Sequence, residues 1–132
     1  MTVSAATSRL RPSQERERFS VSIDKWSDSI LVVELQDDPS LSDDLAALQE
    51  QLDAGAKVDV VIDFSSVHYL NSSNLARLLR IRKQITGSDR RLVLCGIDTN
   101  VWSVFLVTGL DKIFECADNV STALASVRIT AE

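Results

Sequence analysis

The chain has 132 residues, a net charge of −5 and 45% apolar residues, the size and composition of one soluble globular domain. No window approaches the ~18 uninterrupted apolar residues of a membrane helix, and the acidic balance disfavours a nucleic-acid binder. The N-terminus lacks the apolar segment of a secretory signal. A cytoplasmic location without membrane insertion is therefore expected.

The opening of the chain divides into a tail and a predicted hairpin. Residues 1–18 are polar, contain Pro12 and show no hydrophobic period, so we predict a flexible tail before a single domain at 19–132. Strand-like runs at 19–26 and 29–35 are separated by a short turn, which predicts a β-hairpin.

A loop, QDDPSLSDD, leads into the first predicted helix at 43–55, which Ser42 or a neighbour should cap and Gly55 should end. The nearly continuous β-branched run at 58–64 is typical of a strand covered on both faces. The loop has paired acids but no calcium-loop spacing, so we expect them to be solvated rather than to hold a metal. These acids are Asp37, Asp38, Asp43 and Asp44.

A second helix is predicted after the polar run Asn71–Asn74 and should end at Gly87. Five of its apolar residues are expected to face inward: Leu75, Leu78, Leu79, Ile81 and Ile85.

Four more elements follow in the order strand, helix, short strand and helix, at 91–96, 100–109, 112–117 and 119–129. Asn119 or Ser121 is positioned to cap the last helix. After the hairpin, strands alternate with helices, which predicts right-handed crossovers and helices packed on a mixed sheet.

Two cysteines, Cys95 and Cys116, lie too far apart in the chain for a CxxC motif and cannot form a zinc site alone. We expect both to be buried small hydrophobic residues, with a disulfide as the lesser alternative.

The serine pair Ser72-Ser73 raises the possibility of nucleophilic catalysis with His68 as base and Asp63 as its partner. The chain has no G-x-S-x-G elbow, and the single histidine lies only four residues before Ser72. It also has no glycine-rich phosphate loop. The sequence therefore predicts a non-enzymatic protein without a cofactor.

Two interpretations of the serines stay open from the residues alone. Asn and Ser are strong helix N-caps, because they accept hydrogen bonds from first-turn amides. A serine in a loop before a helix is also accessible to a kinase, and the helix N-terminus favours a phosphoryl group.

Charge is unevenly distributed along the chain. Residues 19–66 carry eleven acids against two lysines, whereas 75–91 are basic, which suits a protein partner of mixed charge. The basic residues are Arg77, Arg80, Arg82, Lys83, Arg90 and Arg91.

The segments DFSSVHYLNSSNLARLLRIRKQI and RLVLCGIDTNVWSVFLVTGLDKIFECADNVSTALASV together resemble STAS domains, particularly anti-sigma factor antagonists. The resemblance covers residues 19–128. It implies an α/β fold with a mixed sheet of four to five strands, about four helices and an opening β-hairpin.

The resemblance also implies a binding switch. Its partners would be an anti-sigma factor with GHKL-type serine kinase activity and a PPM-type serine phosphatase. By position, Ser72 would be the phosphorylated residue, with Ser73 as the secondary candidate. A phosphate on Ser72 could also pair with Arg77 and mask part of the binding surface.

The partner would contact the Asn71–Asn74 run and the exposed side of the next helix, where Arg77, Arg80 and Gln84 share one stripe. Three features depart from the family pattern: Asn71 in place of Asp, Asn74 in place of Gly, and the QDDPSLSDD loop. The alternative function is a scaffold or transporter-accessory subunit that binds constitutively. A homodimer is also an open expectation.

Overall fold

The computed structural model describes residues 23–131. The tail predicted for 1–18 and the first residues of the predicted hairpin lie outside the described residues.

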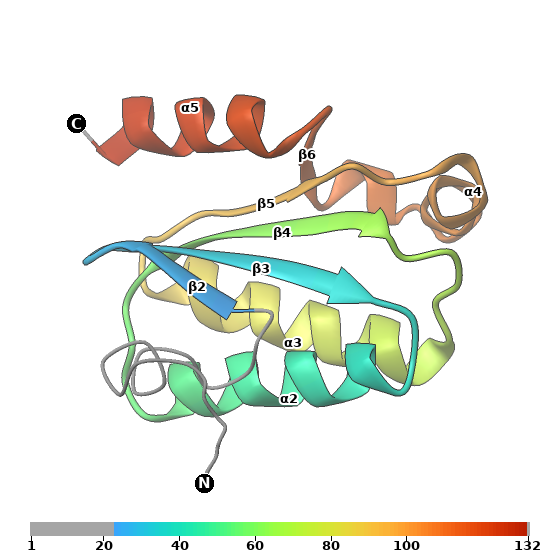
Figure 1. The fold of residues 1–132 in the computed structure, drawn as a ribbon, viewed down its shortest axis with the longest axis horizontal. Coiled ribbons are helices and arrows are strands. Elements are labelled where there is room, and N and C mark those ends of the chain that lie inside the picture. Colours follow the sequence, from blue (N-terminus) through green and yellow to red (C-terminus); the bar gives the residue numbers. More distant parts are fainter. Residues whose placement is uncertain (1–22, 132) are drawn as a thin grey trace, which may run out of the picture.

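Five strands form one sheet, in the spatial order β2-β3-β4-β5-β6 (Figure 1). They are β2 (Ile23–Ser27), β3 (Ile30–Gln36), β4 (Asp59–Ser66), β5 (Leu92–Cys95) and β6 (Glu115–Ala117). β2 runs antiparallel to β3 and the other pairs are parallel. The predicted mixed sheet with an opening hairpin is confirmed.

The helices cover both faces of this sheet. They are α2 (Ser40–Asp53), α3 (Ser72–Gly87), α4 (Thr99–Thr108) and α5 (Val120–Ala131), with a 3-10 turn η1 (Leu110–Lys112) after α4. Figure 1 shows α2 and α3 together on one face, α5 on the other, and α4 near the end of the sheet where β4 and β5 finish.

The central strand β4 is buried from both sides, as its β-branched run predicts. Val60, Val61 and Ile62 are 0% exposed. Val60 and Ile62 belong to the core under α2 and α3, whereas Val61 packs in the smaller core under α5. Because neighbouring side chains of a strand alternate in direction, β4 joins the two cores.

Two predictions about helix faces are wrong. Leu79 is 36% exposed, because the buried stripe of α3 runs through Leu78, Ile81 and Ile85 and Leu79 lies to one side of it. Asp44, expected in a solvated loop, is 5% exposed. The α2 helix begins at Ser40, so Asp44 lies inside the helix on the same buried side as Leu41 and Leu48.

The predicted helix boundaries are largely confirmed. The α2 helix ends before Gly55, whose φ of +102° favours glycine. At the start of α5, Asn119 Oδ1 accepts a hydrogen bond from the amide of Thr122 at 2.9 Å. Asn119, rather than Ser121, therefore caps this helix.

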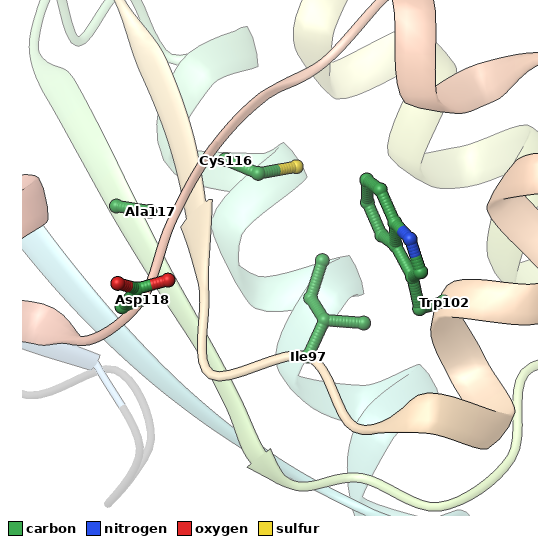
Figure 2. A pocket seen from close by; sticks show the side chains of 5 residues that line it. All are labelled: Ile97, Trp102, Cys116, Ala117 and Asp118. Carbon is green, nitrogen blue, oxygen red and sulfur yellow. The ribbon is translucent and has the colours of Figure 1, made fainter.

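The two cysteines occupy different environments. Cys95 is buried, and burial raises the pKa of its thiol to about 12. Cys116 is exposed, which contradicts its predicted burial, because it lies on the short edge strand β6. Its thiol points toward Trp102 across a hollow of about 330 Å³ (Figure 2). Both thiols are free, so the disulfide alternative is wrong.

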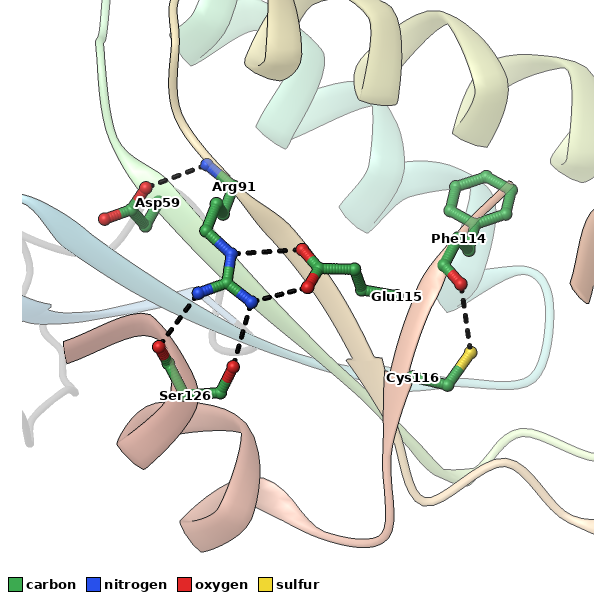
Figure 3. Close-up of polar contacts among 6 residues, drawn as sticks. All are labelled: Asp59, Arg91, Phe114, Glu115, Cys116 and Ser126. Carbon is green, nitrogen blue, oxygen red and sulfur yellow. Dashed lines mark hydrogen bonds and ion pairs between the residues drawn. The ribbon is translucent and has the colours of Figure 1, made fainter. Parts of the chain in front are cut away.

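Arg91 fastens the edge strand β6 and helix α5 to the sheet (Figure 3). Its Nε and Nη2 donate to the two carboxylate oxygens of Glu115 at 3.1 and 2.5 Å. Its Nη1 donates to the carbonyl of Ser126 at 2.9 Å. The bidentate geometry makes this the stronger kind of ion pair.

Asp59 anchors the same end of the sheet from β4. It is 5% exposed and accepts hydrogen bonds from Arg90 Nη2 at 3.1 Å and the Arg91 amide at 2.8 Å. Removing it would leave a partly buried guanidinium and a backbone donor without their carboxylate.

Asp59→Ala is predicted to lower the free energy of unfolding by about 2–3 kcal/mol, because a partly buried ion pair loses one partner. Urea denaturation measures this change. Asp28→Ala is the control: fully exposed Asp28 pairs with Lys25 at 3.5 Å, and its loss should leave the midpoint unchanged. Equal shifts in both variants would contradict the anchoring role.

Candidate functional site

The polar run singled out in the sequence lies where β4 ends and α3 begins, at the carboxyl edge of the parallel strands (Figure 1). Two buried side chains, Val67 and Leu70, fix the connecting loop to the core. Between them His68 and Tyr69 point outward, and Tyr69 is 69% exposed. The loop is therefore held from beneath while it presents polar and aromatic groups to solvent.

Two asparagines form the start of α3. Asn71 is the N-cap, and its Oδ1 accepts from the Asn74 amide at 2.8 Å. In return, Asn74 Oδ1 accepts from the Asn71 amide at 3.1 Å. This reciprocal capping box satisfies two first-turn donors. The cap is thus Asn71, and the two serines stand free of it as the first two residues of the helix.

Asn74, one of the departures from the family pattern, also links α3 to α2. It is 4% exposed, and its Nδ2 donates to Ser42 Oγ at 3.3 Å. A glycine could make neither this bond nor its half of the capping box. The unusual residue at this position therefore has a structural role.

Asp38 caps α2, a role that the sequence predicts for Ser42 or a neighbour. Pro39 occupies the N-cap position without a side-chain hydrogen bond. Asp38 Oδ1 instead accepts from the amide and hydroxyl of Ser42 at 2.9 and 2.7 Å. Its Oδ2 also accepts from Asn71 Nδ2 at 3.5 Å, so one carboxylate serves the starts of α2 and α3. An Asp before a Pro at a helix start is a local signal for the capping of α2. It gives no signal for the contact with Asn71 at the start of α3.

Asp37 holds the loop that precedes α3. Its Oδ1 accepts from the His68 amide at 2.8 Å, and its Oδ2 lies 2.9 Å from His68 Nδ1. The hydrogen bond from the His68 amide is the main reason that the pKa of Asp37 is lowered. The hydrogen bond with the Asp37 carboxylate raises the pKa of His68.

The disfavoured triad does not form among these side chains. His68 is paired with Asp37, whereas Asp63 Oδ1 accepts from the Ser65 amide at 3.0 Å. Gly96 closes in on the other side of Asp63: with φ of +68°, a Cβ there would stand 2.8 Å from Asp63 Oδ1. Asp63 is thus hydrogen bonded within the last residues of β4.

The predicted partner-binding residues of α3 divide into two groups. Arg77 and Arg80 line a hollow of about 350 Å³ together with Ser73, whereas Ser72 is outside its lining. Gln84 lies further along the helix and donates to Asp53 Oδ1 at 2.8 Å, in addition to its hydrogen bond with Gln49. The arginines therefore adjoin the serine run, while Gln84 fastens α3 to α2.

Within residues 23–131, no three His, Cys, Asp or Glu side chains gather as a metal site. In the same range, no helix combines the length and apolar character needed to cross a membrane.

The capping box yields a stability prediction. Asn71→Ala should lower the free energy of unfolding by about 1 kcal/mol, and Asn74→Ala by about 1–3 kcal/mol, because buried polar groups lose their partners. Thermal and urea unfolding test this. Ser73→Ala is the matched control in the same helical turn and should have no effect. A cost for Ser73→Ala equal to that for Asn71→Ala would contradict the assignment of the cap.

The Asp37–His68 pair yields a pH prediction. Because the pKa of His68 is raised in the folded state, its contribution to stability is complete below its unfolded pKa near 6.5. This contribution is lost as the pH rises through the folded pKa. Because the pKa of Asp37 is lowered in the folded state, its contribution to stability is present above its unfolded pKa of 3.8. This contribution is lost as the pH falls through the folded pKa. The pair is strongest between these two unfolded values.

An NMR titration of the His68 ring should therefore give a midpoint above 6.5 that falls in Asp37→Asn. The stability advantage of the original chain over Asp37→Asn should shrink as the pH rises above 6.5 and through the raised pKa of His68. Asp28→Asn, which changes a remote exposed carboxylate, should leave the midpoint unmoved. The Asp37–His68 pairing is refuted if Asp37→Asn also leaves the titration midpoint of His68 unchanged.

Comparison with known proteins identifies the fold and its relatives. The model of the STAS domain family matches residues 14–123. A Bordetella bronchiseptica protein assigned as an anti-sigma factor antagonist, BtrV, is 32% identical over 83 residues, which are 63% of this chain and 71% of that protein.

Two solved structures have the same fold. One is a Thermotoga maritima protein, TM1081, assigned as an anti-sigma factor antagonist (TM-score 0.69, 21% identity, 80% of this chain and 92% of that one). Another is the Bacillus cell fate determinant SpoIIAA in its phosphorylated form (TM-score 0.63, 18% identity, 80% and 96%). With the family model spanning most of the residues and the five-stranded sheet matching these folds, the chain belongs to the STAS domain family.

Proposed function

We propose that the chain is an anti-sigma factor antagonist that works in the cytoplasm. It binds an anti-sigma factor that is also a GHKL-type serine kinase, and phosphorylation of Ser72 ends the binding. A PPM-type phosphatase removes the phosphate. The relatives named as anti-sigma factor antagonists support the general role.

The observation that carries this proposal is the setting of Ser72. It is exposed and begins α3, beside a cap that does not use its hydroxyl. Asn71 and Asn74 fix the backbone on either side of it. A kinase would thus meet a hydroxyl on a rigid, accessible turn, which favours one defined approach of the nucleotide.

The proposed reaction is an ordinary phosphoryl transfer. Ser72 Oγ attacks the γ-phosphorus of ATP held by the kinase, the bond to ADP breaks, and a base of the kinase takes the hydroxyl proton. The product carries nearly two additional negative charges at pH 7. This charge opposes an acidic partner surface and weakens the complex.

The proposed contact surface combines the run Asn71–Asn74 with Arg77 and Arg80. Arg80 is exposed and Arg77 partly so, and neither has a carboxylate partner among residues 23–131. Such arginines steer an acidic partner toward the site. Gln84, which is hydrogen bonded to α2, forms the far end of this surface.

The test is mass spectrometry after incubation of the chain with a purified candidate GHKL-type kinase and ATP. We expect one phosphate on Ser72, lost in Ser72→Ala and retained in Ser73→Ala, the neighbouring exposed serine. Ser72→Asp should weaken binding to the same kinase at least about tenfold. Tight binding without phosphate on either serine would instead favour the scaffold or transporter-accessory role.

A further inference from the structure

The hollow beside the serine run has an unusual lining. Its volume is about 350 Å³, and it is lined by the first turn of α2 and the first three turns of α3. Among residues 23–131, those that line it include no acid: Ser42, Ser73, Asn74, Ala76, Arg77 and Arg80. A cavity whose described wall holds two guanidinium groups and no carboxylate is suited to an anion.

Within residues 23–131, Arg77 and Arg80 differ from the other arginines near them because they make no hydrogen bond or ion pair. Arg90 pairs with Asp59, Arg91 with Glu115, and Arg82 donates to the carbonyl of Ile113 at 3.2 Å. No such partner is found for Arg77 or Arg80 within the part of the chain that the structure describes. As residues i and i+3 of α3 they carry like charges on one side of the helix, which is unfavourable unless an anion lies between them.

The remaining polar groups of the wall define what the anion meets. The Ser42 hydroxyl already donates to Asp38 and accepts from Asn74 Nδ2. Ser42 therefore lines the hollow but has no hydroxyl proton left to donate to an anion. Ser73 is different: its hydroxyl is exposed and is not used by the capping box. Its side chain lies one turn before Arg77 and two turns before Arg80 on the same stripe.

We propose that this hollow binds a phosphate monoester dianion, held by the guanidinium groups of Arg77 and Arg80 and by Ser73. A dianion matches two fixed positive charges, and planar guanidinium groups bind phosphate oxygens through paired hydrogen bonds. Binding is weak and salt-sensitive, because the site is open to solvent.

The phosphate could have either of two sources with the same chemistry. One is a phosphate on Ser73 itself, which would meet Arg77 one helical turn away. The other is a phosphate monoester on a separate molecule. Ser72 lies outside the lining, so the site does not depend on the modification proposed above. An occupied hollow would neutralise the charges that attract an acidic partner, so occupancy and partner binding would oppose each other.

The first experiment titrates the ¹⁵N-labelled chain with inorganic phosphate, and separately with free O-phosphoserine, at constant ionic strength. We expect saturable shifts of the Ser73 and Asn74 amides and of the Arg77 and Arg80 side chains. The double variant Arg77→Gln/Arg80→Gln should weaken binding at least about tenfold.

The matched control is Arg82→Gln/Lys83→Gln, which removes two charges from the same helix outside the hollow and should keep the binding. Shifts that grow linearly with concentration, or that are equally weak in both double variants, would mark an adventitious ion only. In that case the free-phosphate arm counts against the proposal.

The second experiment separates the two sources. Phosphoserine is placed at 73 or at 72 by genetic encoding, and each phosphate is titrated by ³¹P NMR. A lower second pKa at 73 than at 72, abolished by Arg77→Gln/Arg80→Gln, assigns the hollow to the chain's own phosphate. Saturable binding of free phosphate, with equal pKa values at both serines, assigns it to a separate molecule. Failure of both experiments overturns the proposal, whatever a kinase does at Ser72.

Discussion

The central strand β4 is the constraint on which the rest of the structure depends. Val60, Val61 and Ile62 are completely buried, so no water can satisfy their backbone groups and only the ladders to β3 and β5 can do so. This requirement places β4 between two parallel neighbours and covers both sheet faces with helices. The chain can change direction only beyond the buried stretch. The carboxyl edge is therefore where polar groups can meet solvent, and the site lies there.

At that edge, two carboxylates hold segments that are distant in sequence. Asp37 fastens the loop around His68, and Asp38 serves both Ser42 and Asn71. Each bond is modest by itself, since most are exposed. Together they tie the end of β3 to the start of α3, so the serine run rests on a frame built from two different loops.

The sequence is a reliable guide where a local pattern determines the structure. The β-branched run gives β4 and its double cover, Gly55 marks the end of α2, and Asn119 caps α5. These features depend on neighbours within a few residues, and the family resemblance adds the overall order of elements. The sequence also locates the start of α3, although it leaves open which residue caps it.

Features set by tertiary contacts were beyond local patterns. The partners of Asp37 and Asp38 lie 31 and 33 residues away, and no spacing rule connects them. The exposure of Leu79 and the burial of Asp44 depend on how far each helix is rotated about its axis. A rotation equivalent to one residue would exchange buried and exposed positions at the edge of the helix face. The exposure of Cys116 follows from the shortness of β6 at the edge of the sheet. The hollow likewise needs α2 beside α3, which only the fold supplies.

The reciprocal asparagine pair makes the first turn of α3 independent of the chemical state of the neighbouring serines. Asn71 and Asn74 satisfy each other's amides without using either serine, so the helix keeps its first turn whatever is attached to the neighbouring hydroxyl. Under the proposed cycle, both states share one backbone. The exchange between them would then proceed at the speed of the modifying enzymes, with no refolding step. Substitutions could also alter the signal at Ser72 without costing the protein its fold.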